Sequence, residues 1–130
     1  MMALDTTVLI DALRGRRAAD RLRALRGIGG PAPWICAINV DELHRGMRPT
    51  EEESTRNLIE RLRIAPLGAR EGELAGRWRR EFAARGVTLS QADCLIAAAA
   101  VGVGAELATG NPKDFPMAEL TIRHWPVGER

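Results

Sequence analysis

Short apolar segments alternate with longer segments in which apolar residues recur at helical spacing, and this alternation limits the folds open to the chain. The strand-like segments cover residues 2–4, 34–38, 64–67, 105–109 and 120–125. Strands that alternate with helices are typical of a parallel sheet with helices on both faces. We therefore expect an α/β fold, a three-layer α/β/α sandwich with a four- to five-stranded parallel sheet.

The segments between the strands begin and end at ordinary helix signals. We expect a first helix between Asp5 and Gly15, and five more over residues 16–26, 39–47, 51–63, 70–85 and 90–101. Asn39 is predicted to cap the third of these helices. Pro66 lacks a backbone N–H, so the third strand is expected at an edge of the sheet.

Length and composition describe one ordinary globular domain over residues 1–130. The chain is 45% hydrophobic and 28% charged, and a domain of this size can hold a core without disulfides. The longest apolar run, residues 94–103, is far shorter than the roughly 20 residues that span a membrane. Cys36 and Cys94 have no Cys or His at ligand spacing and are expected to be buried thiols. We therefore expect a cytoplasmic protein without a membrane segment.

The basic residues number 19, yet only Lys113 among them is lysine, and the net charge is +2. Arginine is well shaped for bidentate phosphate contacts, so a polyanionic partner is permitted. Most of the arginines in residues 14–26 are nevertheless expected on a solvated helix face, with RNA contact as the alternative.

Four acidic residues are predicted to meet at one edge of the sheet. Asp5 ends the first strand, Glu42 is expected in the first turn of the helix after the second strand, and Asp114 follows the fourth strand. Asp93 is expected in the first turn of a helix whose N-terminus points to the same edge. Ligand sites of parallel sheets form where the carboxyl ends of the strands meet.

Each acid also has a purely structural explanation. Glu42 and Asp93 lie three residues after Asn39 and Ser90, as in a capping box, and Asp5 and Asp114 could serve a helix cap and a turn. Four carboxylates on one edge would repel one another unless a cation neutralised them. Because the donors are hard oxygens, the sequence favours Mg²⁺ or Mn²⁺, and hence phosphoryl chemistry.

Several motifs together resemble a known family. They are the segments 4–11 (LDTTVLID), 42–43 (EL), 93–98 (DCLIAA) and 109–115 (TGNPKDF). In this order they are similar to PIN-domain nucleases, and above all to the VapC ribonuclease toxins of bacterial toxin–antitoxin pairs. The resemblance spans residues 4–125 and implies a PIN-like fold.

The resemblance also implies which residues act. Asp5, Glu42, Asp93 and Asp114 match the acidic quartet that holds the metal and is catalytic, and Thr6 and Asn111 match supporting polar residues. The sequence departs from the family where Gln91 replaces an acid and where Asn111 replaces an aspartate, so either Asp114 or Asn111 could complete the metal site.

The implied function is a Mg²⁺-dependent endoribonuclease toxin that cleaves structured RNA, such as tRNA, by metal-activated water. Its implied partners are a cognate antitoxin and a second copy of the chain in a homodimer. The alternative is a non-catalytic PIN-like module that binds RNA or protein.

Residues outside the acidic quartet are expected to be structural. Asp11 is predicted to form a surface ion pair with Arg14, three residues along the same helix. His44 and His124 are isolated in the sequence and do not belong to the acidic set. The three tryptophans are expected in cores or interfaces; they are Trp34, Trp78 and Trp125.

Overall fold

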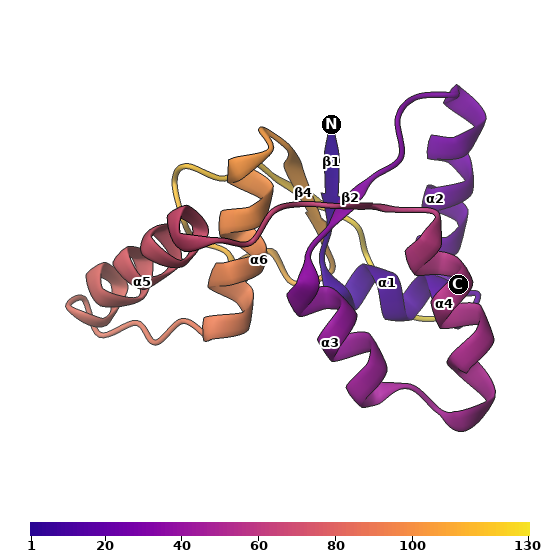
Figure 1. Cartoon of the computed structure of the whole chain (residues 1–130), viewed down its shortest axis with the longest axis horizontal. Helices are drawn as coiled ribbons and strands as arrows, with labels where there is room; N and C mark the ends of the chain where they lie inside the picture. Colours follow the sequence, from indigo (N-terminus) through magenta and orange to yellow (C-terminus); the bar gives the residue numbers. More distant parts are fainter.

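A five-stranded parallel sheet with helices on both faces forms the whole molecule (Figure 1). The computed structural model describes all 130 residues. The strands are β1 Met2–Leu4, β2 Trp34–Ile35, β3 Arg63–Ile64, β4 Glu106–Thr109 and β5 Ile122–His124. The helices are α1 Thr6–Leu13, α2 Arg17–Ile28, α3 Ala37–Gly46, α4 Glu52–Glu60, α5 Ala69–Ala83 and α6 Gln91–Gly102, with 3₁₀ turns η1 Pro49–Glu51 and η2 Pro112–Asp114. The predicted three-layer α/β/α fold is confirmed.

The strand order places β1 at the centre of the sheet. The order is β3-β2-β1-β4-β5, and every neighbouring pair is parallel. Ala3 of β1 lies opposite Trp34 on one side and Leu107 on the other. The chain therefore builds outward from β1 in one direction and later in the other, so the strand order reverses between β1 and β4, where parallel sheets commonly bind their ligands.

Alternation of side chains along the strands divides the interior into two cores. Ala3 and Leu107 belong to the core under α5 and α6, whereas Leu4 and Ala108 belong to the core under α1 and α2. Successive strand residues point to opposite faces, so both faces of this sheet are buried. In Figure 1, α5 and α6 lie on one side of the strands and α1, α2 and α4 on the other.

Two expectations about buried side chains hold. Both cysteines are buried and free. Burial raises the pKa of the Cys36 thiol, and it raises the pKa of Cys94 to about 11, so both are packing residues rather than nucleophiles. Trp78 and Trp125 are buried in the cores. None of the six helices combines the length and the apolar composition needed to cross a bilayer.

The second strand is shorter than predicted. Only Trp34 and Ile35 pair as a strand, and the chain enters α3 at Ala37, after Cys36. Asn39 is therefore the third residue of α3 and not its cap; its side chain accepts a hydrogen bond from the Cys36 backbone N–H at 2.8 Å. This early start also places Glu42 in the second turn of α3 rather than the first. An apolar run cannot by itself distinguish a strand from the first turn of a buried helix.

The predicted surface ion pair of Asp11 is wrong. Asp11 is buried, and its carboxylate accepts hydrogen bonds from the backbone N–H groups of Ala18 and Gly128, each at 2.8 Å. Arg14 lies 3.6 Å from Glu51 instead. Ala18 is in the first turn of α2, whose own cap residue, Arg16, makes no side-chain cap. Asp11 thus caps α2 from the neighbouring helix and holds the end of the chain.

Replacement of Asp11 by alanine should strongly destabilise the fold. The change leaves the buried Ala18 N–H and the partly buried Gly128 N–H without acceptors, which costs about 2–3 kcal/mol in the free energy of unfolding. Thermal unfolding followed by circular dichroism should show a Tm lower by about 8 °C or more. Asp20→Ala is the control, because Asp20 is exposed and pairs only with Arg23 and Arg130 on the surface. Equal losses for both variants would contradict the role of Asp11.

Candidate functional site

The fold brings the four predicted acids to the carboxyl edge of the sheet. We call this set the acidic rim: Asp5, Glu42, Asp93 and Asp114. Asp5 follows β1, Asp93 lies in the first turn of α6 and Asp114 ends η2, after β4. The pKa of the Asp93 carboxyl is raised to about 6: burial is the largest cause, the charges of the other three carboxylates act in the same direction, and a hydrogen bond with Ser90 acts against them. Asp93 is therefore close enough to the other three carboxylates to be affected by their charges.

Asp5 is the most firmly held of the four. Its Oδ1 accepts a hydrogen bond from the Thr6 backbone N–H at 2.8 Å. Its Oδ2 accepts two more, from Thr7 Oγ1 at 2.9 Å and from Thr109 Oγ1 at 2.7 Å. Asp5 is 4% exposed. Three donors from two different segments thus fix the orientation of a buried carboxylate.

A chain of hydrogen bonds through Asn39 and Thr6 fixes the orientation of Glu42. The amide Nδ2 of the buried Asn39 donates to Thr6 Oγ1 at 3.0 Å and to the Leu4 backbone oxygen at 3.3 Å. Thr6 Oγ1 in turn donates to Glu42 Oε1 at 2.6 Å. Since the amide occupies the acceptor side of the hydroxyl, the hydroxyl proton is directed to the glutamate.

The segment after β4 contributes the remaining predicted residues. Asp114 is half-buried and Asn111 is exposed, and neither side chain has a hydrogen-bond partner within the protein. The Asn111 backbone N–H donates to Thr109 Oγ1 at 3.0 Å. The side chains of both residues are therefore free to contact a ligand, while the backbone of the segment is tied to the site.

Three residues of the site were missed in the sequence. Thr109 could have been found by the rule that located Asp5, because it also ends a strand at the carboxyl edge. Asn39 was noticed only as a helix cap, although its amide joins β1 to α3. Thr7 carries no signal in the sequence, since its contact with Asp5 depends on the local turn into α1.

The donor chemistry of the rim suits a divalent cation. All four side chains are carboxylates, which Mg²⁺ and Mn²⁺ prefer. The pKa of Asp93 is raised by burial and, to a lesser extent, by the neighbouring negative charges, which a cation would offset. No three Asp, Glu, His or Cys side chains lie close enough together in this structure to hold a metal ion. The rim fits such an ion by the type of its donors and not by a ready-made ligand geometry.

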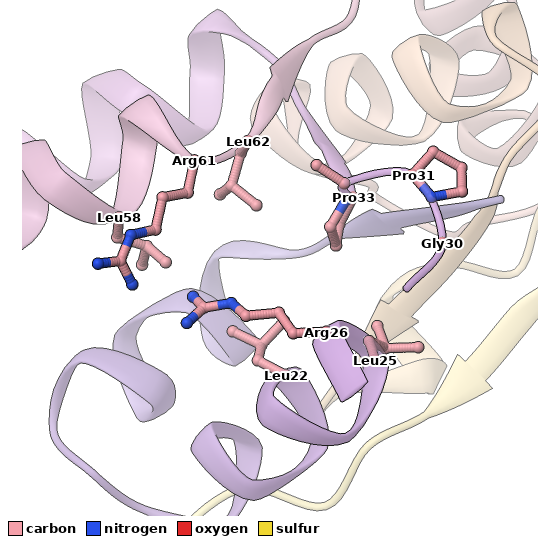
Figure 2. A pocket seen from close by; sticks show the side chains of 10 residues that line it. Leu22, Leu25, Arg26, Gly30, Pro31, Pro33, Leu58, Arg61 and Leu62 are labelled. Carbon is pink, nitrogen blue, oxygen red and sulfur yellow. The ribbon is translucent and has the colours of Figure 1, made fainter. Parts of the chain in front are cut away.

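A cavity lies away from the rim, between α2 and α4. It measures about 440 Å³ and its apolar wall includes Leu22, Leu25, Leu58 and Leu62. Figure 2 shows Arg26 and Arg61, one from each wall, with their guanidinium groups turned toward each other. A smaller adjoining cavity shares Leu22, Arg26 and Leu58 and continues toward α1. We call this continuous surface the α2–α4 groove.

Comparison with known proteins gives one consistent result. The family model of the PIN domain matches residues 2–118. Ribonuclease VapC10 of Mycobacterium tuberculosis is 36% identical over 124 residues, which cover 92% of this chain and 89% of the relative. Ribonuclease VapC19 of the same species is 30% identical over 117 residues, covering 90% and 94%.

Solved structures share the fold over almost the whole chain. A toxin–antitoxin complex from Klebsiella pneumoniae has a TM-score of 0.77 and 28% identity, covering 95% of this chain and 97% of that one. VapBC2 from Rickettsia felis, bound to a DNA fragment from its promoter, has a TM-score of 0.79, 23% identity and coverages of 95% and 98%.

The Asp93→Asn variant should unfold at a higher temperature than the native chain in metal-free buffer. The folded-state pKa of about 6 lies above the ordinary value of 3.8, so stability falls as the pH rises from about 4 to about 6 and stays reduced above it. Because Asp93 is half-buried, we expect a gain of about 1 kcal/mol at pH 7, or about 3–6 °C in Tm.

The gain should shrink steadily as the pH falls toward 4, because the carboxyl is then protonated in the folded state and close to half protonated in the unfolded state. Thermal unfolding in EDTA at pH 4, 5 and 7 measures this dependence. Asp41→Asn is the matched control, since it removes an exposed carboxylate from α3. A gain that does not change with pH would contradict the electrostatic explanation.

Proposed function

Because this chain belongs to the PIN domain family, as its sequence motifs predicted, we propose that it is a metal-dependent endoribonuclease toxin of the VapC type. The observation that carries the proposal is the acidic rim: four carboxylates from four separate segments lie at one edge of the sheet, and burial together with the charges of the other three raises the pKa of Asp93. The name ribonuclease borne by the relatives VapC10 and VapC19 supports the same activity.

The acidic rim would hold Mg²⁺ or Mn²⁺, with Asn111 as the alternative to Asp114 for the last position. When bound, such an ion supplies the Lewis acidity that phosphodiester hydrolysis by water requires. Asp5 and Glu42 are held by hydrogen bonds before any ligand arrives, so little reorganisation is needed at these two residues. Thr6 orients Glu42, and the Thr109 hydroxyl orients both Asp5 and the Asn111 backbone.

We propose structured RNA, such as tRNA, as the substrate, on the strength of the family resemblance. The arginines of α2 offer exposed cations for a phosphate backbone; Arg17, Arg21 and Arg26 all face solvent. The alternative function, a PIN-like module that binds RNA or protein without cleaving it, predicts that the acidic rim can be altered without effect.

We further propose a cognate antitoxin as partner, and a homodimer as the assembly, both implied by the resemblance. The Klebsiella pneumoniae structure is a toxin–antitoxin complex. Two surfaces of this chain suit such a partner. The acidic rim would attract an arginine or lysine of the antitoxin, and the α2–α4 groove would take an amphipathic helix with apolar residues inward and acidic residues toward Arg26 and Arg61.

The variants Asp5→Asn, Glu42→Gln and Asp93→Asn should each reduce RNA cleavage by about 100-fold or more while the protein stays folded. Each removes one charged oxygen donor and preserves the shape of the side chain. Asp114→Asn should cause a smaller loss, because Asn111 lies on the same segment. The assay is cleavage of a tRNA pool by the antitoxin-free chain in Mg²⁺, with sequencing of the new RNA ends.

Hydrolysis by water under metal control leaves a 5′-phosphate and a 3′-hydroxyl and stops in EDTA. Asp41→Asn, on the exposed face of α3, is the matched control and should cleave normally. Cyclic phosphate ends or cleavage that persists in EDTA would overturn the mechanism. Full activity in all three variants, or RNA binding without cleavage by the native chain, would favour the non-catalytic alternative.

Charge reversal in the α2–α4 groove should weaken antitoxin binding. Arg26→Glu and Arg61→Glu place a negative charge where an acidic partner helix is expected, so we predict a Kd at least about 10-fold higher for the cognate antitoxin. Calorimetric titration of purified toxin with antitoxin measures this. Arg80→Glu on α5 is the matched control, because Arg80 is also exposed but lies outside the groove. Unchanged affinity in both groove variants would exclude this docking surface.

A further inference from the structure

The segment that follows β5, residues 125–130, returns across the molecule and is fastened to α1 and α2. The Trp125 backbone N–H donates to the Thr109 oxygen at 2.9 Å. The Gly128 N–H donates to the buried Asp11 at 2.8 Å, and the Gly128 oxygen accepts from the Arg17 N–H at 3.3 Å. We call residues 125–130 the C-terminal strap.

Between its two fastened points, the strap presses Val127 against Gly110, the residue that follows β4. A Cβ at position 110 would lie 2.8 and 2.9 Å from the two γ-methyl groups of Val127. Rotation about χ1 of Val127 cannot relieve this overlap. Two of its three staggered γ-positions face Gly110, and the two methyl groups always fill two of the three, so at least one methyl faces Gly110 in every rotamer. The glycine is therefore required by the close approach of the strap.

Gly110 connects the strap to the acidic rim. Its backbone N–H donates to Thr7 Oγ1 at 3.1 Å, and Thr7 Oγ1 donates to Asp5 Oδ2 at 2.9 Å. A hydroxyl group has one proton, so an N–H that occupies its acceptor side directs that proton toward the carboxylate. The position of Gly110 thus determines whether Thr7 can hold Asp5.

We propose that the C-terminal strap positions the Asp5 carboxylate for cation binding through Val127, Gly110 and Thr7. Val127 of the strap packs against Gly110 and fixes its position. The Gly110 N–H orients the Thr7 hydroxyl, and Thr7 and Thr109 together donate hydrogen bonds to Asp5 Oδ2. Val127, Gly110 and Thr7 are positioning residues: they act through Asp5 and touch neither cation nor substrate. The inference rests on the proposed function for its catalytic consequence, but its structural part does not.

Steric rescue tests the contact between the strap and Gly110. Gly110→Ala should weaken Mn²⁺ binding at least about 5-fold and slow RNA cleavage at least about 10-fold, because the new Cβ displaces Val127. Val127→Ala should weaken both by a smaller factor, about 2- to 3-fold, because Gly110 loses its contact with the valine methyls while Asp11 still holds Gly128. The double variant should return to the level of Val127→Ala. Gly76→Ala is the matched control, because a Cβ there meets no atom within 4 Å.

Hydrogen exchange of the backbone amide at position 110, followed by NMR, tests the contact between the strap and this residue without RNA or metal. The amide should exchange at least about 10-fold faster in Gly110→Ala than in the native chain, and slowly again in the double variant. If the native chain cleaves no RNA, the proposed function fails while this exchange pattern still supports the strap. Exchange and Mn²⁺ affinity that stay native in Gly110→Ala, or a double variant as impaired as Gly110→Ala, would overturn the inference.

Variants of Thr7 keep the test decisive if Gly110→Ala does not fold. Thr7→Val preserves the side-chain volume but removes the hydroxyl, so Mn²⁺ affinity should fall at least about 5-fold. Thr7→Ser restores the hydroxyl and should bind Mn²⁺ within about 2-fold of the native chain. Loss in both variants would indicate a packing role, and loss in neither would exclude Thr7; either result contradicts the proposal.

Discussion

The parallel direction of all five strands is the constraint on which the site depends. Because β1 is central and pairs with both β2 and β4, the carboxyl ends of these three neighbouring strands lie at the same edge of the sheet. Asp5, Glu42 and Asp114 reach that edge from segments far apart in the sequence. A reversed strand would send its carboxylate to the opposite edge, so the sheet topology concentrates the negative charge.

Hydrogen bonds from three threonine hydroxyls fix the orientation of the crowded carboxylates Asp5 and Glu42. Thr6 joins Asn39 to Glu42, Thr7 joins Gly110 to Asp5, and Thr109 joins the segment after β4 to Asp5. Each hydroxyl donates to a carboxylate and accepts from an amide N–H. Carboxylates that would otherwise repel one another are thereby held in place by neutral groups, and the backbone around them is tied to the same network.

The sequence by itself determined the class of fold and the acids at its edge. Strand and helix periodicities are local properties, and Asp5, Asp93 and Asp114 follow local signals such as a strand end, a capped helix and a turn. An apolar run that continues from a strand into a buried helix does not mark the boundary between them. For that reason the sequence predicts Asn39 as a cap and places Glu42 one turn too early.

Only the tertiary structure decided which polar groups meet. Asp11 and Arg14 have the spacing of a helical ion pair, yet the return of the chain at Gly128 and the start of α2 surround Asp11 with backbone N–H groups, and it is buried. Gly110 is an ordinary turn residue until Val127 packs against it. Such contacts join residues more than 15 positions apart, or join backbone groups that all residues share, so no sequence pattern records them.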